Sequence, residues 1–480
     1  MKTPFDDSLK EECGVFGIYG SEDSAAHTAL GLHALQHRGQ EAAGVVTYDS
    51  GRFYSHKALG HVGDNFNSEK VIESLQGDCA IGHVRYSTSG DKHDRNIQPV
   101  FAEFSFGGMA IAHNGNLTNS QTLRKQLIHD GAIFQSTMDT EIFIHLIAKC
   151  NSGKVVDRFK EALKQAQGAY SLVALTQKKL IAARDPLGVR PLVLGRLGKS
   201  YIVASESCAF DIIGATYVRD IEPGEVIVID KDGLSSSRLF EEKKQRFCVF
   251  EYIYFARPDS FVEGKSVYDI RKRIGAELAK EGSVKADVVV PVPDSGVPAA
   301  LGYAEEAKLP FEFGIIRNHY VGRTFIQPSD AVRHLGVKLK HNSNMSVLKD
   351  KKVILVDDSI VRGTTSKKIV SMVREAGAKE VHMRIASPPT TDPCFYGVDT
   401  PSKENLIAAN YSVEEIADII GADSLEFISI DGLYRATGEK GRDDKSPKYC
   451  DACFTNDYPL EVLDKKGGAV SLFTETRKES

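Results

Sequence analysis

Two adjacent carboxylates, Asp357 and Asp358, stand where an apolar run ends, and a loop of small and cationic residues follows them. Carboxylates in such a place can accept hydrogen bonds from ribose hydroxyls or bind a hard cation such as Mg2+. A small-residue loop that leads into a helix offers free N–H groups, which suit a 5′-phosphate. We therefore predict a sugar-phosphate site that comprises Asp357, Asp358, Ser359, Arg362, Gly363, Thr364 and Thr365.

The elements on either side of this loop follow from the pattern of apolar residues. Residues 353–356 are four consecutive apolar residues, which is typical of a buried parallel strand. Residues 366–378 place Ile369, Val370 and Val373 on one side, which predicts a helix. The loop lacks the Gly-x4-Gly-Lys-Ser/Thr spacing of a P-loop. The alternative is an ordinary strand–turn–helix with a solvated Asp pair, but such turns rarely place two acids directly behind a buried strand.

Composition limits the class of protein. The 480 residues predict two or three domains, and 42% hydrophobic with 26% charged residues is ordinary for a soluble globular chain. A net charge of −5 argues against broad nucleic-acid binding, and no apolar run approaches the ~18 residues of a membrane helix. The polar residues 1–12 do not resemble a secretory signal, and eight scattered cysteines suggest thiols and metal ligands rather than disulfides. We expect a cytoplasmic protein with no membrane or nucleic-acid partner.

The first half of the chain carries five short motifs rich in chemically active residue types. They begin at Cys13 (CGVFGIYG), His37 (HRGQE), His83 (HVRYST), Ala112 (AHNGNL) and Met138 (MDTE). Between them, strand-like segments predict stacked sheets flanked by helices; the segments are near 81–86, 108–113, 170–176, 180–184, 201–205 and 225–230. Taken singly, a Cys in an apolar strand is usually a small buried hydrophobe, and an Asn-Gly pair is usually a hairpin turn.

In this order the motifs resemble those of the N-terminal-nucleophile glutamine amidotransferases. The resemblance implies an α+β glutaminase domain, an αββα sandwich, over residues 13–242, in which Cys13 attacks the side-chain amide of glutamine. A thiolate is a strong nucleophile, and a free α-amino group beside it can act as the activating base. That amine exists only if residues 1–12 are removed, so we expect residues 1–12 to be a propeptide.

The same resemblance assigns roles around the expected glutamine site. It implies that Arg85 binds the α-carboxylate of glutamine, a bidentate contact that suits a guanidinium, and that Asp139 binds the α-ammonium. Asn114 and the backbone N–H of Gly115 would form the oxyanion hole, which is often a large contribution to catalysis.

From about residue 247 onward, apolar strands and helices alternate, which predicts a parallel α/β sheet. The acidic pair and its loop resemble the phosphoribosylpyrophosphate (PRPP) motif of the type I phosphoribosyltransferases. The resemblance implies an α/β type I phosphoribosyltransferase domain with a parallel sheet over residues 243–480. In it, Asp357 and Asp358 would contact the ribose and one Mg2+, and the following loop would bind the 5′-phosphate.

Two further segments of this half belong to the expected PRPP site. A buried strand over 286–293 ends at a turn that holds Asp294, Ser295 and Gly296, and ligands of open α/β sheets bind at that edge. The resemblance implies that the turn binds pyrophosphate, with Ser295 near the metal. Residues 317–328, which include Arg323, resemble the family's flexible catalytic loop; the alternative is an ordinary exposed loop.

Four cysteines of the second half form another distinctive set. Cys450 and Cys453 make a Cys-x-x-Cys pair, whereas Cys248 and Cys394 stand alone. Such a pair can bind zinc, act in redox exchange, or do neither. Four thiolates together suit zinc and an iron–sulfur cluster equally well, and their spacing does not decide between the two.

Along nearly its whole length the chain resembles the amidophosphoribosyltransferase family. One branch of that family has both a propeptide and a [4Fe–4S] cluster on four cysteines, which implies one cluster on Cys248, Cys394, Cys450 and Cys453. The implied reaction converts glutamine, PRPP and water to 5-phosphoribosylamine, glutamate and pyrophosphate, the first step of de novo purine synthesis, with ammonia passed between the two sites. A homo-oligomer, commonly a tetramer, that purine nucleotides inhibit is also implied.

Two other classes of protein would share part of this pattern. Another N-terminal-nucleophile amidotransferase would share the first half, but the loop at 357–365 argues against it. A PRPP-sensing regulator would share the second half, but it would not need Cys13, Arg85, Asn114 and Asp139.

Overall fold

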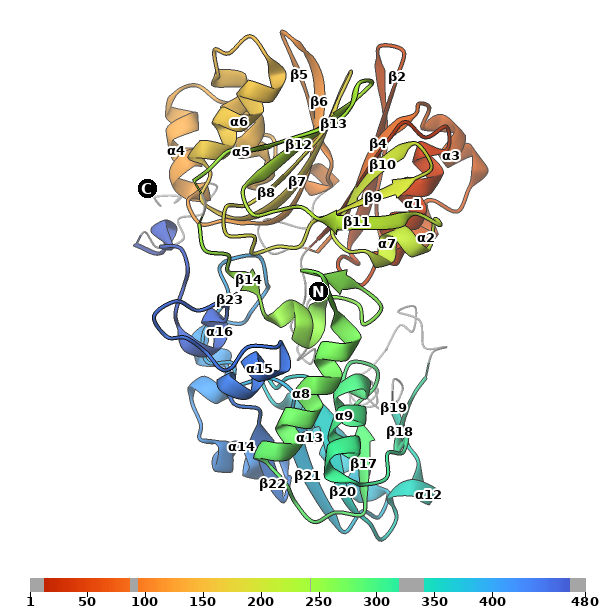
Figure 1. Ribbon diagram of the computed structural model, residues 1–480, viewed down its shortest axis with the longest axis vertical. Helices are drawn as coiled ribbons and strands as arrows, with labels where there is room; N and C mark the ends of the chain where they lie inside the picture. Colours follow the sequence, from red (N-terminus) through yellow and green to blue (C-terminus); the bar gives the residue numbers. More distant parts are fainter. Residues whose placement is uncertain (1–12, 87–93, 242, 319–340, 467–480) are drawn as a thin grey trace, which may run out of the picture.

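The computed structural model of the protein describes residues 13–86, 94–241, 243–318 and 341–466. They form two halves, the upper and the lower in Figure 1. The upper half, residues 13–241, contains two stacked antiparallel sheets, and the lower half contains a smaller parallel sheet between helices. None of the helices in these ranges combines the length and hydropathy that a membrane crossing requires.

The two sheets of the upper half run through most of its length. Within the described residues, the first sheet has seven strands in the order β11-β9-β10-β1-β4-β2-β3 and the second has six in the order β13-β12-β8-β7-β6-β5. The strands of the first sheet are β1 (Gly14–Tyr19), β2 (Ala42–Asp49), β3 (Arg52–Leu59), β4 (Cys79–Arg85), β9 (Val193–Leu197), β10 (Ser200–Ala204) and β11 (Thr216–Asp220). Those of the second are β5 (Val100–Phe104), β6 (Gly107–Leu117), β7 (Gly168–Thr176), β8 (Leu180–Arg184), β12 (Glu225–Asp230) and β13 (Gly233–Arg238).

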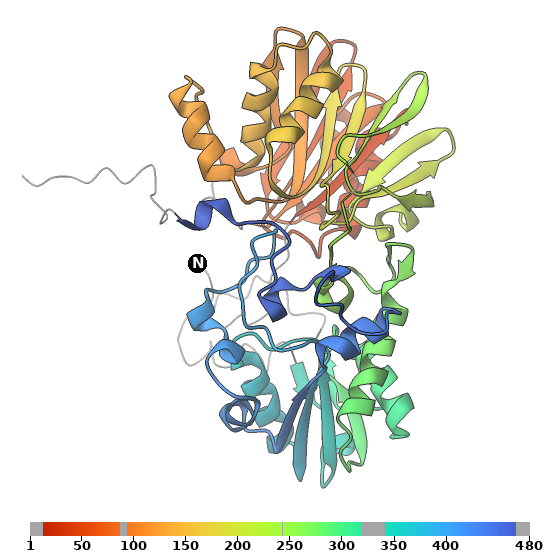
Figure 2. The ribbon, with the colours of Figure 1, turned by 60° about the vertical axis from the view of Figure 1, so that its left-hand side comes forward.

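Helices cover the outer face of each sheet, and a third apolar layer separates the sheets. The first sheet packs against α1 (Ser24–Ala34), α2 (Val62–Asn65), α3 (Glu69–Ser74) and α7 (Cys208–Asp211). The second packs against α4 (Ser120–His129), α5 (Thr140–Lys149) and α6 (Val155–Gln165), which Figure 2 shows on the outside of the upper half. Between the sheets, Val15 and Ile81 meet Val173 and Leu180. This arrangement confirms the predicted αββα sandwich.

A parallel sheet in the order β17-β20-β21-β22 forms the centre of the lower half. Its strands are β17 (Val288–Pro291), β20 (Lys352–Asp357), β21 (Glu380–Ile385) and β22 (Ser424–Phe427). One face is covered by α8 (Val267–Glu281) and α9 (Val297–Ala307), and the other by α13 (Thr364–Glu375) and α14 (Val413–Ile420). Helices on both faces bury most residues of the strands, as is typical of parallel sheets. The α/β prediction for this half is confirmed.

Shorter elements complete the described chain. They are η1 (Asp94–Asn96), β14 (Phe247–Cys248), the π-helix η2 (Glu251–Phe255), β15 (Phe261–Val262), β16 (Lys265–Ser266), β18 (Ile315–Arg317), β19 (His341–Ser343), α12 (Met345–Leu348), η3 (Lys403–Asn405), η4 (Ile407–Ala409), α15 (Ile430–Ala436), β23 (Tyr449–Cys450), α16 (Ala452–Thr455) and η5 (Leu463–Lys466).

The elements around the acidic pair differ from the predicted ones only at their ends. Helix α13 begins at Thr364 rather than at 366, because Gly363 takes a left-handed conformation (φ 78°) and forms its N-cap. The helix ends at Glu375, two residues before Gly377, which has φ 94°. Strand β17 is shorter than the predicted 286–293, although the N–H of Val292 still donates to the carbonyl of Val356.

The two halves are joined by more than the single chain crossing near residue 242. Strand β14, at the start of the lower half, pairs in parallel with β23 near its end, and the N–H of Cys248 in β14 donates to the carbonyl of Val189 in the upper half (3.1 Å). The carboxylate of Asp464 accepts hydrogen bonds from the N–H groups of Gln121 (2.8 Å) and Thr122 (3.2 Å) at the start of α4. Asp464 thus caps a helix of the upper half, and Figure 2 shows its segment beside that helix. The halves therefore share contacts drawn from both ends of the lower half.

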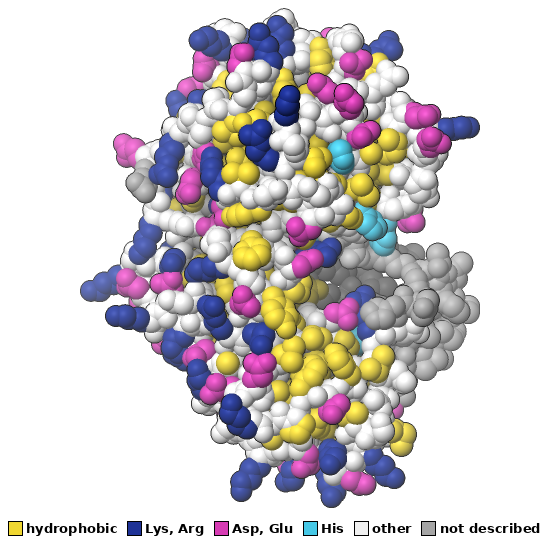
Figure 3. All heavy atoms as spheres, turned by 45° about the vertical axis from the view of Figure 1, so that its right-hand side comes forward, with side chains coloured by type: hydrophobic (Ala, Val, Ile, Leu, Met, Phe, Trp, Pro, Cys, Tyr) yellow, Lys and Arg dark blue, Asp and Glu magenta, His cyan; other side chains and the backbone are white. Residues whose placement is uncertain are grey.

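The face shown in Figure 3 carries basic and acidic side chains interspersed over both halves. This mixture agrees with the net charge of −5.

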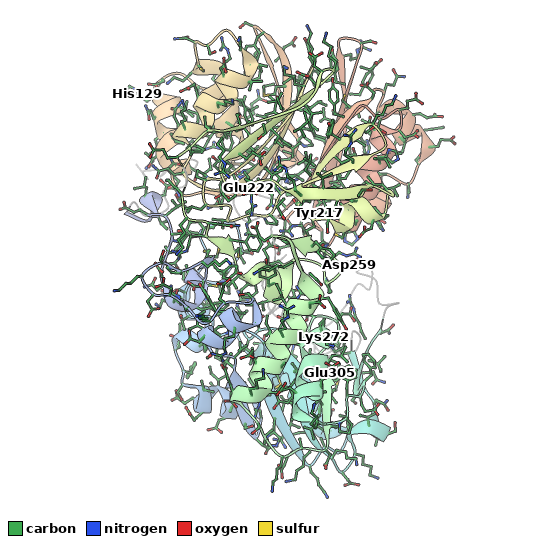
Figure 4. The ribbon with its side chains drawn as sticks, viewed as in Figure 1. His129, Tyr217, Glu222, Asp259, Lys272 and Glu305 are labelled. Carbon is green, nitrogen blue, oxygen red and sulfur yellow. The ribbon has the colours of Figure 1, made fainter. Side chains whose placement is uncertain are left out.

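Helices α8 and α9 pack closely against each other. An added Cβ on Gly275 of α8 would lie 1.8 Å from the carbonyl oxygen of Ala299 in α9. Across the outside of this pair, Lys272 and Glu305, both labelled in Figure 4, form an ion pair of 2.8 Å.

Candidate active sites

The predicted nucleophile lies at the start of the first sheet. Cys13 immediately precedes β1, has φ 61°, and is 8% exposed. Its thiol points to the carbonyl oxygen of Tyr86 at 3.6 Å, just after β4. Because β1 pairs with β4, with Gly14 opposite Val84, Cys13 and Arg85 come to the same end of two neighbouring strands. The structure thus brings together two residues that are seventy positions apart in the sequence.

Three buried polar atoms near this end have no hydrogen-bond partner among the described residues. They are Nη2 of Arg85 and both side-chain atoms, Oδ1 and Nδ2, of Asn114. Arg85 is 3% exposed and Asn114 is fully buried, in β4 and β6 respectively. Leaving such groups unpaired costs about 1–3 kcal/mol each, so they are expected where a ligand completes them. Their types suit a carboxylate and an amide or oxyanion.

The other two predicted residues of this site are Gly115, on strand β6, and Asp139, at the N-cap of helix α5. Gly115 has φ 142°, and an added Cβ would lie 2.1 Å from the carbonyl oxygen of Ala169, so only glycine fits there. The carboxylate of Asp139 accepts a hydrogen bond from the N–H of Leu117 (3.0 Å) and lies 3.4 Å from Nδ1 of His113. Burial raises the pKa of Asp139, but His113 and backbone hydrogen bonds outweigh it and hold the pKa below its usual range. Asp139 is therefore anionic, and its hydrogen bond from Leu117 holds the start of α5 against β6.

The second site is at the carboxyl edge of the parallel sheet. Neighbouring strands β17 and β20 end there, with Pro291 opposite Val356. An added Cβ on Gly296 would lie 2.4 Å from the carbonyl oxygen of Val356, so the turn after β17 presses against the end of β20. The predicted pyrophosphate turn and the predicted acidic pair consequently meet, which open α/β sheets favour as a ligand site.

The acidic pair is buried and electrostatically costly. Asp357 is 7% exposed and Asp358 is 8% exposed. Burial raises the pKa of Asp358, and hydrogen bonds from Ser295 and Ser359 lower it only in part. Ser359 Oγ donates to Asp358 at 2.6 Å. Two adjacent carboxylates with a serine hydroxyl form a hard oxygen donor set, and a divalent cation would offset the cost of their charge.

The remaining residues of the loop lead into helix α13. Thr364 and Thr365 occupy its first turn, whose N–H groups have no partner within the helix. Arg362 is exposed, whereas Gly363 is buried, and an added Cβ there would lie 2.8 Å from the side chain of Ile407. Asp294 is exposed and forms an ion pair with Arg317 of β18. The loop therefore presents helix-start donors beside the acidic pair.

The four cysteines of the lower half gather at the junction between the halves. Cys248 lies opposite Cys450 in the β14–β23 pair, and the carbonyl of Cys453 accepts hydrogen bonds from the N–H groups of residues 391 and 392. Burial raises the pKa values of the Cys450 and Cys453 thiols, and the neighbouring Cys248 and Cys394 raise them further. The described ranges contain no group of three or more His, Cys, Asp or Glu side chains close enough to hold a metal ion. The four thiols are nevertheless near enough to act on one another's pKa, and thiols are the soft donors that iron–sulfur clusters require.

Two of the predicted features lie outside the described residues: the propeptide at 1–12 and the loop residue Arg323. Other residues next to the sites were given no role in the sequence analysis. Arg38, part of the HRGQE motif, donates from Nε to the carbonyl of Cys13 at 3.4 Å. Arg271 of α8 is buried close enough to Asp358 to act on its pKa. The HRGQE motif could have indicated a functional role for Arg38. No sequence signal marks Arg271, because it lies in an ordinary amphipathic helix.

Comparisons with known proteins match a domain model to part of each half of the chain. A glutamine amidotransferase domain model matches residues 83–211, and a phosphoribosyl transferase domain model matches residues 259–387. The amidophosphoribosyltransferases of Rhizobium etli and Bacillus subtilis are 57% and 49% identical to this chain, over 96% and 95% of it and 94% and 95% of their own lengths. A chloroplastic amidophosphoribosyltransferase of Arabidopsis thaliana is 52% identical, over 97% of this chain and 83% of its own.

A solved structure is also similar over nearly the whole chain. It is glutamine PRPP amidotransferase from B. subtilis complexed with ADP and GMP, and it is 48% identical with a TM-score of 0.89. The match covers 94% of this chain and 98% of that chain.

Proposed function

This chain belongs to the amidophosphoribosyltransferase family, and we propose from its geometry how its two sites divide the family's reaction. The enzyme makes 5-phosphoribosylamine from PRPP, glutamine and water, which is the first step of purine biosynthesis. We assign glutamine hydrolysis to residues 13–242, amine transfer to residues 243–480, and a propeptide to residues 1–12. Ammonia released at the first site passes to the second without entering solvent, where most of it would be protonated.

The observation that carries the first assignment is the set of unpaired buried polar atoms around Cys13. Free glutamine offers a carboxylate for Arg85, an ammonium for Asp139, and an amide carbonyl for Asn114 and the N–H of Gly115. Attack by the Cys13 thiolate places negative charge on that carbonyl oxygen. Donors already aimed at this position stabilise the charge without rearrangement, which is the main effect of an oxyanion hole.

The second assignment rests on the edge where β17 and β20 end. Asp357 and Asp358 bind the ribose hydroxyls of PRPP, and with Ser295 they would hold one Mg2+. When bound, Mg2+ neutralises the charge that develops on the departing pyrophosphate. The turn with Asp294, Ser295 and Gly296 binds the pyrophosphate.

The 5′-phosphate of PRPP lies at the start of α13. The residues that bind it are Ser359, Arg362, Gly363, Thr364 and Thr365. Arg323, which belongs to the segment that resembles the catalytic loop, completes the site.

We also propose that the four thiols at the junction bind a [4Fe–4S] cluster. Its ligands would be Cys248, Cys394, Cys450 and Cys453, which are near enough to act on one another's pKa. We further propose that purine nucleotides inhibit the enzyme, because a B. subtilis relative was solved with ADP and GMP. A homotetramer in the cytoplasm is the expected state of the protein.

One pair of measurements tests the branch-specific assignments. N-terminal sequencing of protein purified without oxygen should begin at Cys13, and its visible spectrum should show the brown absorbance of an iron–sulfur cluster. A colourless chain that begins at Met1 and is fully active with glutamine would overturn both assignments.

A variant tests the division of labour. Cys13→Ala should abolish synthesis with glutamine and retain synthesis with ammonium salts at high pH. Loss of both activities in a folded variant would refute the assignment of separate sites.

A further inference from the structure

Four charged side chains are completely buried at the junction between the halves. Arg38 and Glu206 come from the upper half, as does Arg190, whereas Glu251 is the first residue of the π-helix η2 at the start of the lower half. Removing charges from water is costly unless each is paired and hydrogen-bonded. Burying two guanidiniums and two carboxylates together is therefore expected only where the cluster has a structural or functional role. The residues that it contacts indicate which role this is.

Arg38 connects this set to the nucleophile. Its Nε donates to the carbonyl oxygen of Cys13 at 3.4 Å, and its Cδ would lie 3.5 Å from a Cβ added to Gly14. The guanidinium thus lies along the backbone of the first two residues of the expected mature chain. A shift of Arg38 would move the backbone from which both the Cys13 thiol and its α-amino group extend.

Two carboxylates hold Arg38, one from each half. Glu251 accepts from Nη2 of Arg38 at 2.8 Å and from Nη1 at 3.2 Å, a bidentate contact that fixes the plane of the guanidinium. Glu206 accepts from Nη1, but it also lies 2.7 Å from Nε2 of His37 and accepts from the N–H of Arg257 (2.8 Å) and the hydroxyl of Ser260 (2.7 Å). Glu206 thus divides its oxygens among several groups, whereas Glu251 gives Arg38 a bidentate contact that constrains the orientation of the guanidinium.

Glu251 is itself fixed by a third contact. Arg190 donates from Nη1 to Glu251 at 3.1 Å and from Nε to the carbonyl of Tyr396 at 3.0 Å. Glu251 also begins a π-helix, a form that is frequent at functional sites. These contacts hold the Glu251 carboxylate in one orientation, and the bidentate contact in turn constrains the orientation of the Arg38 guanidinium.

We propose that Glu251 is a positioning residue for glutamine hydrolysis. It holds Arg38, and through Arg38 the backbone of Cys13, so the hydrolysing site is completed by a side chain of the transferase half. The inference rests on the proposed role of Cys13 as nucleophile. Glu251 touches neither substrate; its effect passes through one guanidinium.

The chain offers a matched control at the same junction. Glu263 also belongs to the lower half and forms a 2.6 Å ion pair with a buried arginine of the upper half, Arg184. Arg184 donates its other hydrogen bonds to the carbonyls of Gly188, Arg190 and Ile221 rather than to Cys13. Glu263→Gln therefore removes a carboxylate charge from the same interface while keeping both carboxylates, Glu206 and Glu251, that contact Arg38. Asp259, labelled in Figure 4 at this junction, marks the segment between the two glutamates.

The experiment compares Glu251→Gln with Glu263→Gln in the full-length, processed enzyme. Misplacing a reacting group by about 1 Å can cost about 100-fold in rate. We expect Glu251→Gln to lower kcat with glutamine by about 10–100-fold. The KM for glutamine should stay within about twofold, because Arg85 and Asp139 remain in place, and synthesis with ammonium salts should also stay within about twofold. Glu263→Gln should leave all three quantities near wild type.

A second measurement separates positioning from general loosening. The rate at which iodoacetamide alkylates Cys13, followed by the mass of the Cys13 peptide across pH 6–9, reports the surroundings of the thiol. Glu251→Gln should shift this pH profile and Glu263→Gln should not. If Glu251→Gln does not fold, Glu251→Asp, which keeps the charge but shortens its reach, is judged by the same criteria.

The outcomes distinguish the inference from the function on which it rests. A wild-type profile and unchanged glutamine kcat in Glu251→Gln would overturn the positioning role, as would an equal loss with ammonium salts. If Cys13→Ala kept its activity with glutamine, the proposed nucleophile would itself be wrong, whatever Glu251→Gln does.

Discussion

Replacing Asn114 by alanine separates a catalytic from a structural role more cleanly than any other change at the first site. In the described structure both polar atoms of its side chain are buried and lack a hydrogen-bond partner. A structural asparagine at such a place would be hydrogen-bonded, and its loss would destabilise the fold. An asparagine of an oxyanion hole should instead lower the stability of the substrate-free fold. It should stabilise the transition state only when substrate is bound.

The two roles predict different magnitudes. Removal of one oxyanion donor typically lowers kcat by about 10²–10³-fold, which is about 2.7–4 kcal/mol of transition-state stabilisation. An unpaired buried polar group costs about 1–3 kcal/mol, and the alanine variant no longer has that cost. Removing this cost offsets the packing energy that is lost with the small amide group. We therefore expect a large fall in glutamine kcat with an unfolding free energy within about 1 kcal/mol of wild type or above it.

The assay measures glutamate release, synthesis with ammonium salts and urea unfolding on the same preparation. Asn116→Ala is the matched control, since Asn116 lies two residues along the same strand and donates to the carbonyl of Phe395 at 2.9 Å. It should lose about 1 kcal/mol of stability and little glutaminase activity. A fall of less than tenfold in Asn114→Ala, or a stability loss larger than that of Asn116→Ala, would refute the oxyanion assignment.

Three further changes probe the second site and the junction. Asp357→Asn should lower PRPP-dependent pyrophosphate release far more than glutaminase activity, and equal losses would contradict its place in the transferase site. Because burial raises the pKa of Asp358, its protonated form stabilises the ligand-free fold below pH ~4, and this contribution is lost as pH rises through the raised pKa. Urea unfolding of Asp358→Asn without Mg2+ should therefore show a smaller loss of stability between pH 4 and pH 7 than wild type; an unchanged slope would contradict the burial argument. Asp464→Ala should cost about 1 kcal/mol and speed amide hydrogen exchange at Gln121 and Thr122, whose N–H groups it caps. Unchanged exchange there would exclude the cap.

What could be predicted from the sequence was mostly local. The run at 353–356 became β20 because four apolar residues can be buried on both faces only within a covered parallel sheet. The apolar side of residues 366–378, with Ile369, Val370 and Val373, became the buried face of α13 because those residues recur at helical spacing. The ends of elements were less certain, since a left-handed glycine such as Gly363 can begin a helix two residues early.

The contacts across the junction could not be predicted in this way. Arg38 and Glu251 are 213 positions apart, and no periodicity or spacing relates two such residues. Arg271 lies beside the acidic pair only because α8 crosses the sheet at that point. The resemblance implied that Cys13 and Arg85 share one site, but the strand pairing that brings them together was not predicted. Site residues that lie within one motif could therefore be predicted from the sequence. The residues from distant segments that hold them in place could not.

The cap that Asp464 places on helix α4 has a consequence for the order in which the protein is made. Ribosomes add about 5–20 residues per second, so roughly 17–70 s separate Gln121 from the residue that caps its helix, 343 positions later. During that interval the nascent upper half has an uncapped α4. Completion of the upper half must therefore wait until translation of the lower half is nearly finished.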